Sequence, residues 1–405
     1  MSDLVLVSVT GRDKPGVTHA LTRVLTGTNV VILDIGQSVI HQNLNLGMLF
    51  DLSACTDSSK VMLDLLYKAH ELELDLKFNP VSHDEYSQWA NEKGKDRQII
   101  TLLARRVTSE HISMVSQILT SQNLNISEIV RLSGRLALEH RDQDEGKSCV
   151  QLTVRGTASD DDAMRAAFMT AATDMNVDIA WQKDDLYRRN RRLVVFDMDS
   201  TLIEAEVIDE LAKEAGVGEQ VAEITELAMQ GKLDFQQSFR QRMALLKGLD
   251  ESVLEQIAQR LPITEGADHL IRNLKLMGYK TAILSGGFNY FGRHLQKRFG
   301  VDYVYANELE IVDGKVTGNV VGTIVDGNRK AELLREIAEC EGIRLEQTIA
   351  VGDGANDLPM LNLAGLGIAF RAKPMVRENA EQSISTLGLD GILYLLGLRD
   401  QDFQG

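Results

Sequence analysis

A short apolar run that ends in acidic residues, LVVFDMDSTL over 193–202, most constrains the fold of this 405-residue chain. LVVF is typical of a strand, and further strand-like runs then alternate with helical patterns. These runs are YKTAILSGG (279–287), TIAVGDGAND (348–357) and LGIAFRA (366–372), with a predicted hairpin that turns at Asp313–Gly314. Residues 206–261 show only helical patterns. The alternation predicts an α/β fold: a doubly wound, Rossmann-like parallel sheet with a helical insert.

Polar side chains follow several of these predicted strands or begin a helix. Asp197 and Asp199 follow LVVF, Ser285 follows TAIL, Asp353 follows TIAV, and Lys330 opens the helical run KAELLREIAE. In a parallel sheet, the active site lies beyond the carboxyl ends of the strands. We therefore expect one edge of the sheet to collect these side chains.

This set of side chains suits the transfer of a phosphoryl group. A carboxylate can attack phosphorus and form an aspartyl phosphate. Because the attack brings an anion towards a phosphate dianion, a cation is needed, and Mg²⁺ prefers a few oxygen ligands plus waters and substrate phosphate. We expect Asp353 to be a ligand of that ion, and Ser285, Lys330 and backbone N–H groups to hold the transferring oxygens. The second aspartate would protonate the leaving alcohol and then deprotonate the attacking water.

DMDST (197–201), the serine of SGG at 285, Lys330 and GDGAND (352–357) together resemble the four motifs of the haloacid dehalogenase superfamily, in that family's order. DMDST resembles the DxDxT phosphatase form and not the DKTGT form of ion-pumping ATPases. The resemblance implies that Asp197 is the nucleophile and Asp199 the acid/base. It also implies that Mg²⁺ is held by Asp197, by the backbone carbonyl of Asp199 and by Asp353.

The resemblance extends to the phosphoserine phosphatase family over nearly all of 192–396, in segments such as DMDSTLIEAEVIDELAKEAG, LSGGFNYF and VGDGANDLPML. It implies hydrolysis of O-phospho-L-serine to L-serine and phosphate, the final step of serine synthesis. Glu206 would bind the substrate's ammonium, and Arg242 would bind its carboxylate in a bidentate pair. The resemblance also assigns Ser285, Gly286 and Lys330 to the phosphate, Met229 and Phe235 to an apolar lid in the cap, and Asn356 and Asp357 to orienting the phosphate and supporting the metal shell.

The first 180 residues contain a segment with the predicted order β-α-β-β-α-β, which is a ferredoxin-like α+β arrangement, and a second segment that repeats most of this order. We place these two repeats at 1–80 and 97–180. A polar linker over 81–96 separates them, and a charged linker over 181–192 precedes the phosphatase-like domain at 192–396.

Both repeats resemble ACT domains, small units that often bind amino acids. In the first repeat, the turn containing Asp13, Pro15 and Gly16 fits the ligand-binding turn of that family, and a helix N-terminus there can bind a carboxylate. Regulatory serine is the candidate ligand. The corresponding turn of the second repeat, ARRVTSEHIS, lacks the Pro-Gly pair. The alternative interpretation is that the repeats serve only for dimerisation, and the resemblance implies a homodimer.

Composition narrows the classes of partner and compartment. The net charge of −16 disfavours nucleic acid and anionic membranes, because both are polyanions. The three cysteines form no CxxC pair and no disulfide framework, so we expect a reducing, cytoplasmic setting. No apolar stretch approaches the ~18–20 residues that would cross a bilayer. The N-terminal segment does not resemble a signal peptide.

Two other functions stay open at this point. The same chemistry could serve another small phosphate ester, or could transfer the phosphoryl group to another alcohol. Alternatively, the chain could be mainly an amino-acid sensor with an inactive phosphatase domain. The paired residues Glu206 and Arg242 favour an amino-acid substrate over other esters. The intact pair Asp197 and Asp199 argues against an inactive domain.

Overall fold

The acidic motif lies in the larger of two compact units into which the chain divides. The computed structural model describes residues 3–91, 97–135, 146–229 and 232–403. One unit is Met1–Lys95 and the other is Asp96–Gly405, so the second repeat shares a unit with the phosphatase-like part of the chain.

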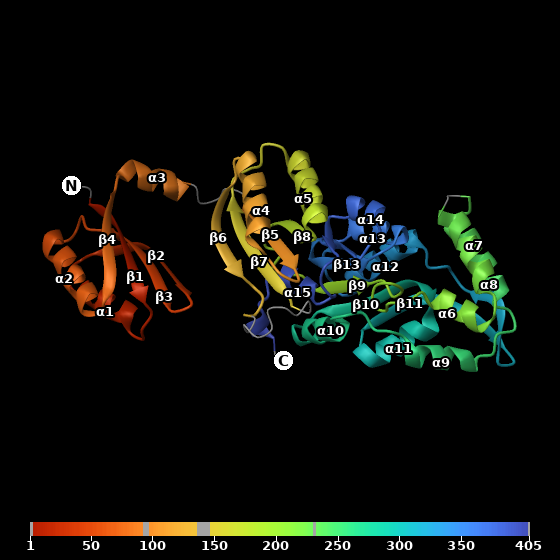
Figure 1. The fold of residues 1–405 in the computed structure, drawn as a ribbon. Helices are drawn as coiled ribbons and strands as arrows, with labels where there is room; N and C mark the ends of the chain where they lie inside the picture. The colour runs from red at the N-terminus through yellow and green to blue at the C-terminus, as the bar shows by residue number, and fades with distance from the viewer. Residues whose placement is uncertain (1–2, 92–96, 136–145, 230–231, 404–405) are drawn as a thin grey trace. The chain divides into compact units, whose positions relative to one another are not determined.

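The smaller unit contains the first repeat. Its elements are β1 (Leu4–Arg12), α1 (Val17–Val24), β2 (Val31–Ile40), β3 (Asn43–Asp51), α2 (Ser58–Glu71) and β4 (Leu74–Val81). The strands form an antiparallel sheet in the order β2-β3-β1-β4, and both helices lie on one face of it (Figure 1). Alternate residues of β1 (Val5, Val7 and Val9) are buried against that face, as a half-buried strand requires.

A helix, α3 (His83–Asn91), occupies most of the stretch that we predicted to be a linker. It has no buried residues, which explains why its polar sequence resembled a linker. Asp84 and Glu85 lie in its first turn, where acidic side chains interact favourably with the helix dipole.

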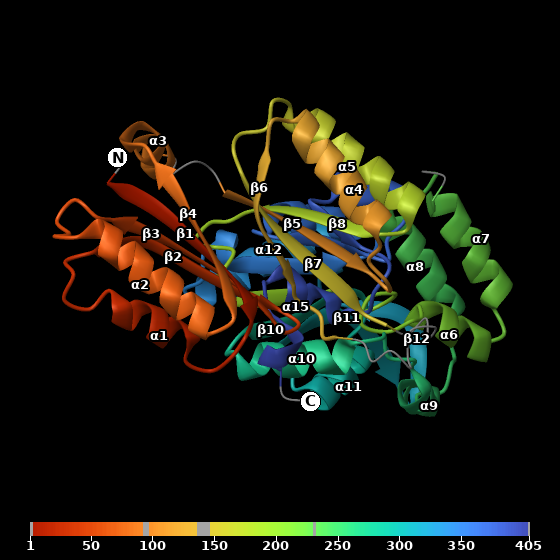
Figure 2. The ribbon, with the colours of Figure 1, turned by 60° about the vertical axis from the view of Figure 1, so that its left-hand side comes forward.

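The second repeat has the same sheet order as the first. Its elements are β5 (Arg97–Ala104), α4 (Ser109–Ser121), β6 (Asn125–Arg131), β7 (Ser148–Arg155), α5 (Asp161–Met175) and β8 (Asp178–Lys183). The order β6-β7-β5-β8 corresponds to β2-β3-β1-β4, and α4 and α5 lie side by side on one face (Figure 2). The predicted duplication is therefore present in the fold. The predicted linker at 181–192 begins inside a strand, because β8 continues to Lys183.

The phosphatase-like part is built on a seven-stranded sheet. Its strands are β9 (Leu193–Phe196), β10 (Lys280–Phe288), β11 (Tyr303–Val312), β12 (Lys315–Val321), β13 (Thr348–Gly352), β14 (Gly367–Phe370) and β15 (Gln382–Ile384). The order is β12-β11-β10-β9-β13-β14-β15, and every neighbouring pair is parallel except β11 and β12. Strand β9 lies centrally, between β10 and β13, so the chain progresses outward from it in both directions. Such a switch point is where ligands bind in open α/β sheets.

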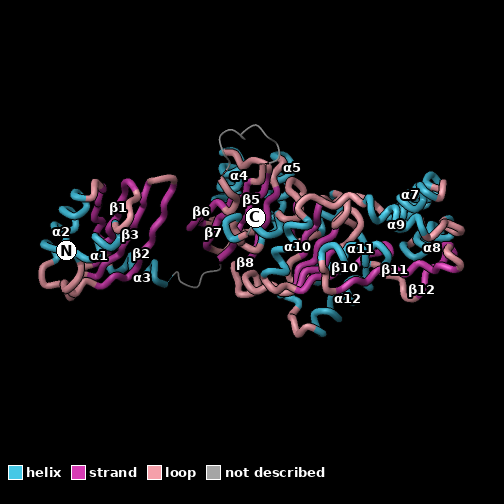
Figure 3. The backbone as a smooth tube through the Cα atoms, turned by 90° about the horizontal axis from the view of Figure 1, so that it is seen from below, coloured by secondary structure: helices cyan, strands magenta, loops and turns pink. Residues whose placement is uncertain are grey.

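Helices cover both faces of this sheet (Figure 3). On β9, Val194 and Phe196 pack on one face with α10 (Ala267–Leu276) and α11 (Asn289–Phe299). Leu193 and Val195 pack on the other face with α12 (Gly327–Cys340) and α13 (Leu358–Leu363). Burial on both faces explains why β9 is a continuous apolar run without alternation. The remaining elements are α14 (Pro374–Asn379), α15 (Gly391–Leu395) and the short 3₁₀ segments η2 (Leu345–Gln347), η3 (Ala355–Asp357) and η4 (Asp400–Asp402).

Four helices fill the segment that we predicted to be a helical cap: α6 (Val207–Glu214), α7 (Gly218–Met229), α8 (Phe235–Leu245) and α9 (Ser252–Arg260). They are gathered at one end of the larger unit (Figures 1 and 3). The two chain connections to this cap run together, because Ile203 forms an isolated bridge with Ile263 and the N–H of Glu204 donates to the carbonyl of Pro262 at 2.9 Å.

Candidate active site

Asp197 lies directly after β9 and is almost completely buried, with 5% of its surface exposed. Its backbone N–H donates to the carbonyl of Val351 at 2.9 Å, which continues the pairing of β9 with β13 past the end of the strand. The N–H of Met198 donates to Oδ1 of Asp197 at 2.7 Å. The backbone therefore fixes both the position of this carboxylate and its orientation.

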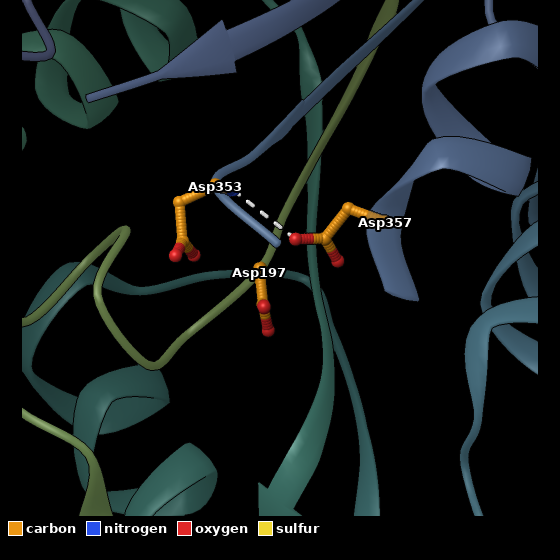
Figure 4. A group of neighbouring side chains, drawn as sticks. All are labelled: Asp197, Asp353 and Asp357. Atoms are coloured by element: carbon orange, nitrogen blue, oxygen red, sulfur yellow. Dashed lines mark hydrogen bonds between the residues drawn. The ribbon is translucent and has the colours of Figure 1, made fainter. Parts of the chain in front are cut away.

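Asp353 and Asp357 lie beside Asp197 (Figure 4). Each of the three residues offers a carboxylate oxygen, and these oxygens all lie within 4.8 Å of one another. Asp353 follows β13, and its Oδ1 accepts a hydrogen bond from the hydroxyl of Thr201 at 3.2 Å. Asp357 comes from η3, and its Oδ2 accepts the N–H groups of Asp353 and Gly354 at 3.1 and 3.0 Å. The backbone of the loop GDGAND (352–357) is thus hydrogen-bonded to the carboxylate of the loop's last residue, Asp357.

Lys330 is the cation of this cluster. Its ammonium lies 2.9 Å from Oδ1 of Asp197 and 2.6 Å from Oδ1 of Asp357, and its side chain is completely buried. Helix α12 begins at Gly327, so Lys330 lies in its first turn and does not open the helix as predicted. The N-cap is Asp326, whose Oδ1 accepts the N–H of Arg329 at 3.0 Å. The run KAELLREIAE gave no sign of this earlier start, because GNR lacks the apolar period on which the prediction depended.

The start of α12 also packs closely on the loop after β13. A Cβ added at Gly327 would lie 2.6 Å from the carbonyl oxygen of Asn356, which is backbone and has little room to move. The predicted phosphate-orienting residue Asn356 is half-buried at this contact. The absence of a side chain at Gly327 therefore lets Lys330 approach the aspartates.

Electrostatics at the site follow from crowding of carboxylates in a buried place. Burial, and then the charge of Asp357, raise the pKa of Asp197 well above its ordinary value, although Lys330 opposes the shift. The same two causes raise the pKa of Asp353 to about 7. Burial lowers the pKa of Lys330, but the charges of Asp197 and Asp357 outweigh it, so the net pKa is raised and the ammonium stays charged.

Asp199 and Glu206 lie on the side of the site that leads into the cap. The N–H of Val207, the first residue of α6, donates to Oδ1 of Asp199 at 3.0 Å. The hydroxyl of Ser200 donates to Oε1 of Glu206 at 2.8 Å, and Ser200 has a left-handed backbone with φ of 54°. Burial, followed by the charge of Glu206, raises the pKa of Asp199 well above its usual range. Burial also raises the pKa of Glu206, whose side chain nevertheless keeps access to solvent.

Ser285 and Gly286 lie in the last part of β10. Ser285 is completely buried, and its hydroxyl accepts the N–H of Gly287 at 2.9 Å. The register of β10 shifts between Leu284 and Phe288, and we call residues 285–287 of this irregular segment the serine turn. A Cβ added at Gly286 would lie 3.1 Å from Cζ of Phe235, so the first residue of α8 in the cap lies over the serine turn. A Cβ at Gly287 would lie 2.4 Å from Oδ2 of Asp199. Because Gly286 and Gly287 have no side chains, the serine turn can lie close to both the cap and Asp199.

Arg242 lies on α8 and is half-buried. Burial lowers its pKa, while Asp209 and Glu206 oppose the shift. Its Nε is buried without a hydrogen-bond partner among the described residues. Met229 is the last residue of α7, and its side chain lies outside the described residues. Asp13, Pro15 and Gly16 belong to the smaller unit, whereas the residues described above belong to the larger one.

Comparison with known proteins identifies the family. A family model described as haloacid dehalogenase-like hydrolase matches residues 191–365, and one described as ACT domain matches residues 3–79. Phosphoserine phosphatase of Streptomyces coelicolor is 39% identical over 409 residues, which cover 99% of this chain and 93% of the relative. The chain belongs to the phosphoserine phosphatase family. Phosphoserine phosphatase SerB2 of Mycobacterium tuberculosis is also 39% identical, over 395 residues that cover 97% of this chain and 93% of the relative.

A solved structure agrees with the haloacid dehalogenase-like fold of this chain. A haloacid dehalogenase family hydrolase from Salmonella enterica subsp. enterica serovar Typhi matches with a TM-score of 0.64 and 32% identity, covering 74% of this chain and 98% of that one. The resemblance to the superfamily and, over residues 3–79, to an ACT domain is therefore confirmed, and so is the predicted fold class. Among the described residues, no helix is both long and apolar enough to span a bilayer.

Sequence reasoning missed one residue of this phosphoserine phosphatase family member that supports the site. Asn307 lies on β11 with 1% of its surface exposed. Its Nδ2 donates to the carbonyl of Gly286 at 2.8 Å, and its Oδ1 accepts the N–H of Val325 at 2.9 Å. It thus ties the serine turn to the segment that leads into α12. The available signal was a single amide inside the strand-like run YVYANELEIV of the predicted hairpin.

Proposed function

We propose that this protein hydrolyses O-phospho-L-serine to L-serine and inorganic phosphate through an aspartyl phosphate on Asp197. The observation that carries the proposal is the contact of Lys330 with Asp197, at 2.9 Å in a buried site with Asp353 and Asp357 beside it. A buried ammonium against a carboxylate at the end of β9 can neutralise both the nucleophile and an incoming phosphate. The family assignment supports the same substrate.

In the first step, an oxygen of Asp197 forms a bond to phosphorus while the bond from phosphorus to the serine oxygen breaks. The electron pair of that bond goes to the serine oxygen, which takes a proton from the carboxylic acid of Asp199. The raised pKa of Asp199, caused by burial and then by Glu206, favours the protonated form that this role needs.

In the second step, water attacks the phosphorus of the aspartyl phosphate. The carboxylate of Asp199 takes the proton from the water, and the bond between phosphorus and the Asp197 oxygen breaks. Inorganic phosphate leaves, Asp197 is again a carboxylate and Asp199 is again an acid. Ser285, the backbone at Gly286 and Lys330 would hold the phosphate oxygens through both steps.

The donor set fits a magnesium ion. Carboxylate oxygens of Asp197 and Asp353 lie close together, and hard oxygen donors are what Mg²⁺ prefers. Both oxygens of Asp357 already accept hydrogen bonds, from Lys330 and from backbone N–H groups, so we assign it a supporting role and not a direct ligand. With the backbone carbonyl of Asp199 as the third protein ligand, a bound Mg²⁺ would offset the negative charge between nucleophile and phosphate.

The cap supplies two groups that suit an amino-acid substrate. Glu206 offers a carboxylate for the ammonium, and it lies at the start of α6, next to Asp199 and Ser200. Arg242 offers a guanidinium whose Nε is buried without a partner in the described part of the chain, so a substrate carboxylate would satisfy it. Phe235 over Gly286 would exclude water from the phosphate.

A substrate panel tests this proposal. Phosphate release would be measured for phosphoserine, phosphoethanolamine, a sugar phosphate and p-nitrophenyl phosphate, each with and without Mg²⁺. Phosphoserine should have the highest kcat/KM. The variant Arg242→Gln should lower kcat/KM for phosphoserine by about 10- to 100-fold and affect phosphoethanolamine, which lacks the carboxylate, far less. If phosphoserine were hydrolysed no faster than phosphoethanolamine or the sugar phosphate, the assigned substrate would be wrong.

We also propose that serine binds the first repeat and inhibits the enzyme, and that the chain is a homodimer. The match of residues 3–79 to an ACT domain supports an amino-acid ligand. Gly16, with φ of 91°, caps α1 without any side-chain cap, which leaves the helix N-terminus available for a carboxylate. Calorimetry with serine on the full chain, alone and with Gly16→Val, would detect such a site, and sedimentation would give the oligomeric state. If the heat of serine binding were the same in Gly16→Val as in the unaltered protein, the regulatory role of the first repeat would be contradicted.

A further inference from the structure

Four charged side chains form a continuous chain of ion pairs between the second repeat and the two connections of the cap. The guanidinium of Arg105 donates to both oxygens of Glu265, at 2.8 and 2.6 Å. Arg371 donates to the second of these oxygens at 2.9 Å and, through its other nitrogen, to Oε1 of Glu204 at 2.9 Å. The order is therefore Arg105, Glu265, Arg371 and Glu204.

The two glutamates stand on the two connections between the cap and the sheet. Glu204 lies two residues before Glu206, on the connection that leads into α6. Glu265 follows α9, on the connection that returns from the cap to α10. Arg371 directly follows β14, the strand beside β13, and its backbone N–H is hydrogen-bonded to Ile384 of β15, so it is anchored at the end of the sheet. One arginine of the sheet thus holds both connections.

The geometry makes this chain of ion pairs more than a set of surface contacts. All four side chains are partly exposed, and isolated exposed pairs contribute little. Here, however, Arg105 is bidentate and Glu265 is shared by two arginines, the arrangements in which such pairs do matter. The guanidinium of Arg371 also lies 5.3 Å from the ring of Phe370, which further restricts its orientation.

The backbone of Arg371 is unusual. Its φ is 45°, in the left-handed region that residues other than glycine and asparagine seldom adopt. Its N–H donates to the carbonyl of Ile384, which extends the pairing of β14 with β15. This conformation aims the side chain away from the sheet and towards Glu204 and Glu265. Such strain persists where surrounding contacts enforce it, and it gathers at functional places.

The second repeat contacts the phosphatase-like part through the turn that follows β5. The corresponding turn of the first repeat, after β1, is the candidate amino-acid site. Arg105 follows β5, in the same place that Asp13 occupies after β1. The hydroxyl of Thr386 also donates to the carbonyl of Leu103 at 3.2 Å, and Asp178 at the start of β8 accepts the N–H groups of Ser385 and Thr386 at 2.9 and 2.8 Å. The end of β5 in the second repeat is therefore docked on the phosphatase-like part.

We propose that Arg371 is a positioning residue for substrate recognition: through Glu204 it holds the segment that carries Glu206, and through Glu265 it ties that segment to Arg105 of the second repeat. The second repeat then acts as a fixed support for the cap connections. Glu206 acts on the ammonium of the substrate, so the selectivity part of this inference rests on the proposed function. Loss of Arg371 would loosen Glu206 and weaken binding of phosphoserine, while a phosphate ester without an ammonium would be unaffected.

The test compares phosphoserine with p-nitrophenyl phosphate in full-length variants. Arg371→Asn removes the guanidinium but keeps a residue that tolerates the left-handed backbone, and Glu204→Gln removes the charge at the other end of the pair. Both should raise KM for phosphoserine by about 3- to 30-fold, with little change in kcat and little change for p-nitrophenyl phosphate. Arg105→Gln should act in the same direction but less. Arg371→Lys, which keeps the charge, should recover part of the affinity.

Arg298→Gln is the matched control, because Arg298 forms a 2.9 Å pair with Asp268, which joins α11 to α10 and includes neither Glu204 nor Glu265. This variant should leave KM and kcat unchanged for both phosphoserine and p-nitrophenyl phosphate. Hydrogen exchange of residues 203–207 gives a readout that needs no substrate: exchange should be faster in Arg371→Asn and Glu204→Gln than in the unaltered protein and in the control. This readout decides the positioning role even if phosphoserine proves not to be the substrate.

Two results would overturn the proposal. One is unaltered hydrogen exchange over 203–207 in both Arg371→Asn and Glu204→Gln. The other is an equal loss of activity towards phosphoserine and p-nitrophenyl phosphate, together with a lowered melting temperature. That result would show that the ion pairs only stabilise the fold in general. Absence of any preference for phosphoserine in the unaltered protein would instead count against the proposed substrate, and hydrogen exchange would then decide on the ion pairs alone.

Discussion

The ammonium of Lys330 lies 2.9 Å from Oδ1 of Asp197, and neither side chain has appreciable contact with solvent. The two residues are far apart in the sequence, and they come from different elements, the first turn of α12 and the end of β9. An ion pair buried to this degree holds its partners in place because each charge would be costly without the other. The proposed nucleophile and the proposed phosphate-binding cation are thereby a single structural feature.

The variant Asp197→Asn should abolish turnover, because an amide cannot form the aspartyl phosphate. We expect a loss of at least about 1,000-fold in kcat, measured by phosphate release with Mg²⁺. Circular dichroism should remain that of the unaltered protein. Asp313→Asn is a suitable control, since Asp313 is exposed at the β11–β12 turn and asparagine tolerates its φ of 52°. Full activity in Asp197→Asn would exclude this residue as the nucleophile.

Replacement of Lys330 by methionine should reduce both activity and stability. The change leaves Asp197 and Asp357 buried without their shared cation, so the free energy of unfolding should fall by about 3 kcal/mol. Urea denaturation followed by tryptophan fluorescence would measure it. Lys297→Met, at an exposed position of α11, should change stability by far less. Equal stability of the two variants would show that the buried pair contributes nothing.

Removal of magnesium should stop the reaction, and Asp353→Asn should weaken binding of the ion. Chelation should abolish phosphate release, and addition of Mg²⁺ should restore it. Asp353→Asn should then require more Mg²⁺ for half-maximal activity, because it replaces a charged ligand with a neutral one. An unchanged requirement in this variant would remove Asp353 from the ligands. Asp268→Asn, in the exposed pair with Arg298, serves as the control.

Asn307→Leu should slow the reaction although Asn307 lies outside the motifs. The change would leave the carbonyl of Gly286 and the N–H of Val325 without their buried partner, which should cost about 1–3 kcal/mol in stability and displace the serine turn. We expect kcat to fall with a smaller change in KM, because phosphate-holding groups act mainly on the transition state. Asn307→Asp can keep only the hydrogen bond from the N–H of Val325, so its kcat should lie between that of Asn307→Leu and that of the unaltered protein. Unaltered kcat in Asn307→Leu would limit this residue to a role in folding.

The pair of Arg105 with Glu265 should stabilise the fold at neutral pH and lose its effect in acid. The hydrogen bond from Arg105 lowers the pKa of Glu265 below its ordinary 4.5. A carboxyl whose pKa is lower in the folded state contributes stability above its unfolded pKa, and this contribution is lost as the pH falls through the folded value. The melting temperature of Arg105→Gln should therefore lie below that of the unaltered protein at pH 7, and the gap should shrink below pH 4.5. A gap that stays constant would show that Glu265 does not titrate in this window.

The elements were largely predictable, because hydrophobic period and turn residues are local signals. The run LVVF is continuous because both faces of β9 are covered, and the repeat of β-α-β-β-α-β appeared in the order of elements despite weak similarity between the two copies. Local signals failed where a segment had no buried face. Helix α3 looked like a linker for that reason, and the first turn of α12 was missed because its early residues are polar.

The sequence by itself determined which groups we propose for the chemistry. Asp197 and Asp199 come directly after a strand, and Ser285, Lys330 and Asp353 lie near the ends of predicted elements. Residue type and local position are enough for that, since parallel strands bring their carboxyl ends to one edge. Only the tertiary structure decided how these groups are held, through the 2.6 Å contact of Lys330 with Asp357, the placement of Asn307 behind the serine turn, and the ion pairs from Arg105 to Glu204. Those contacts join residues far apart in the chain, and no local pattern encodes which distant partner a polar side chain will meet.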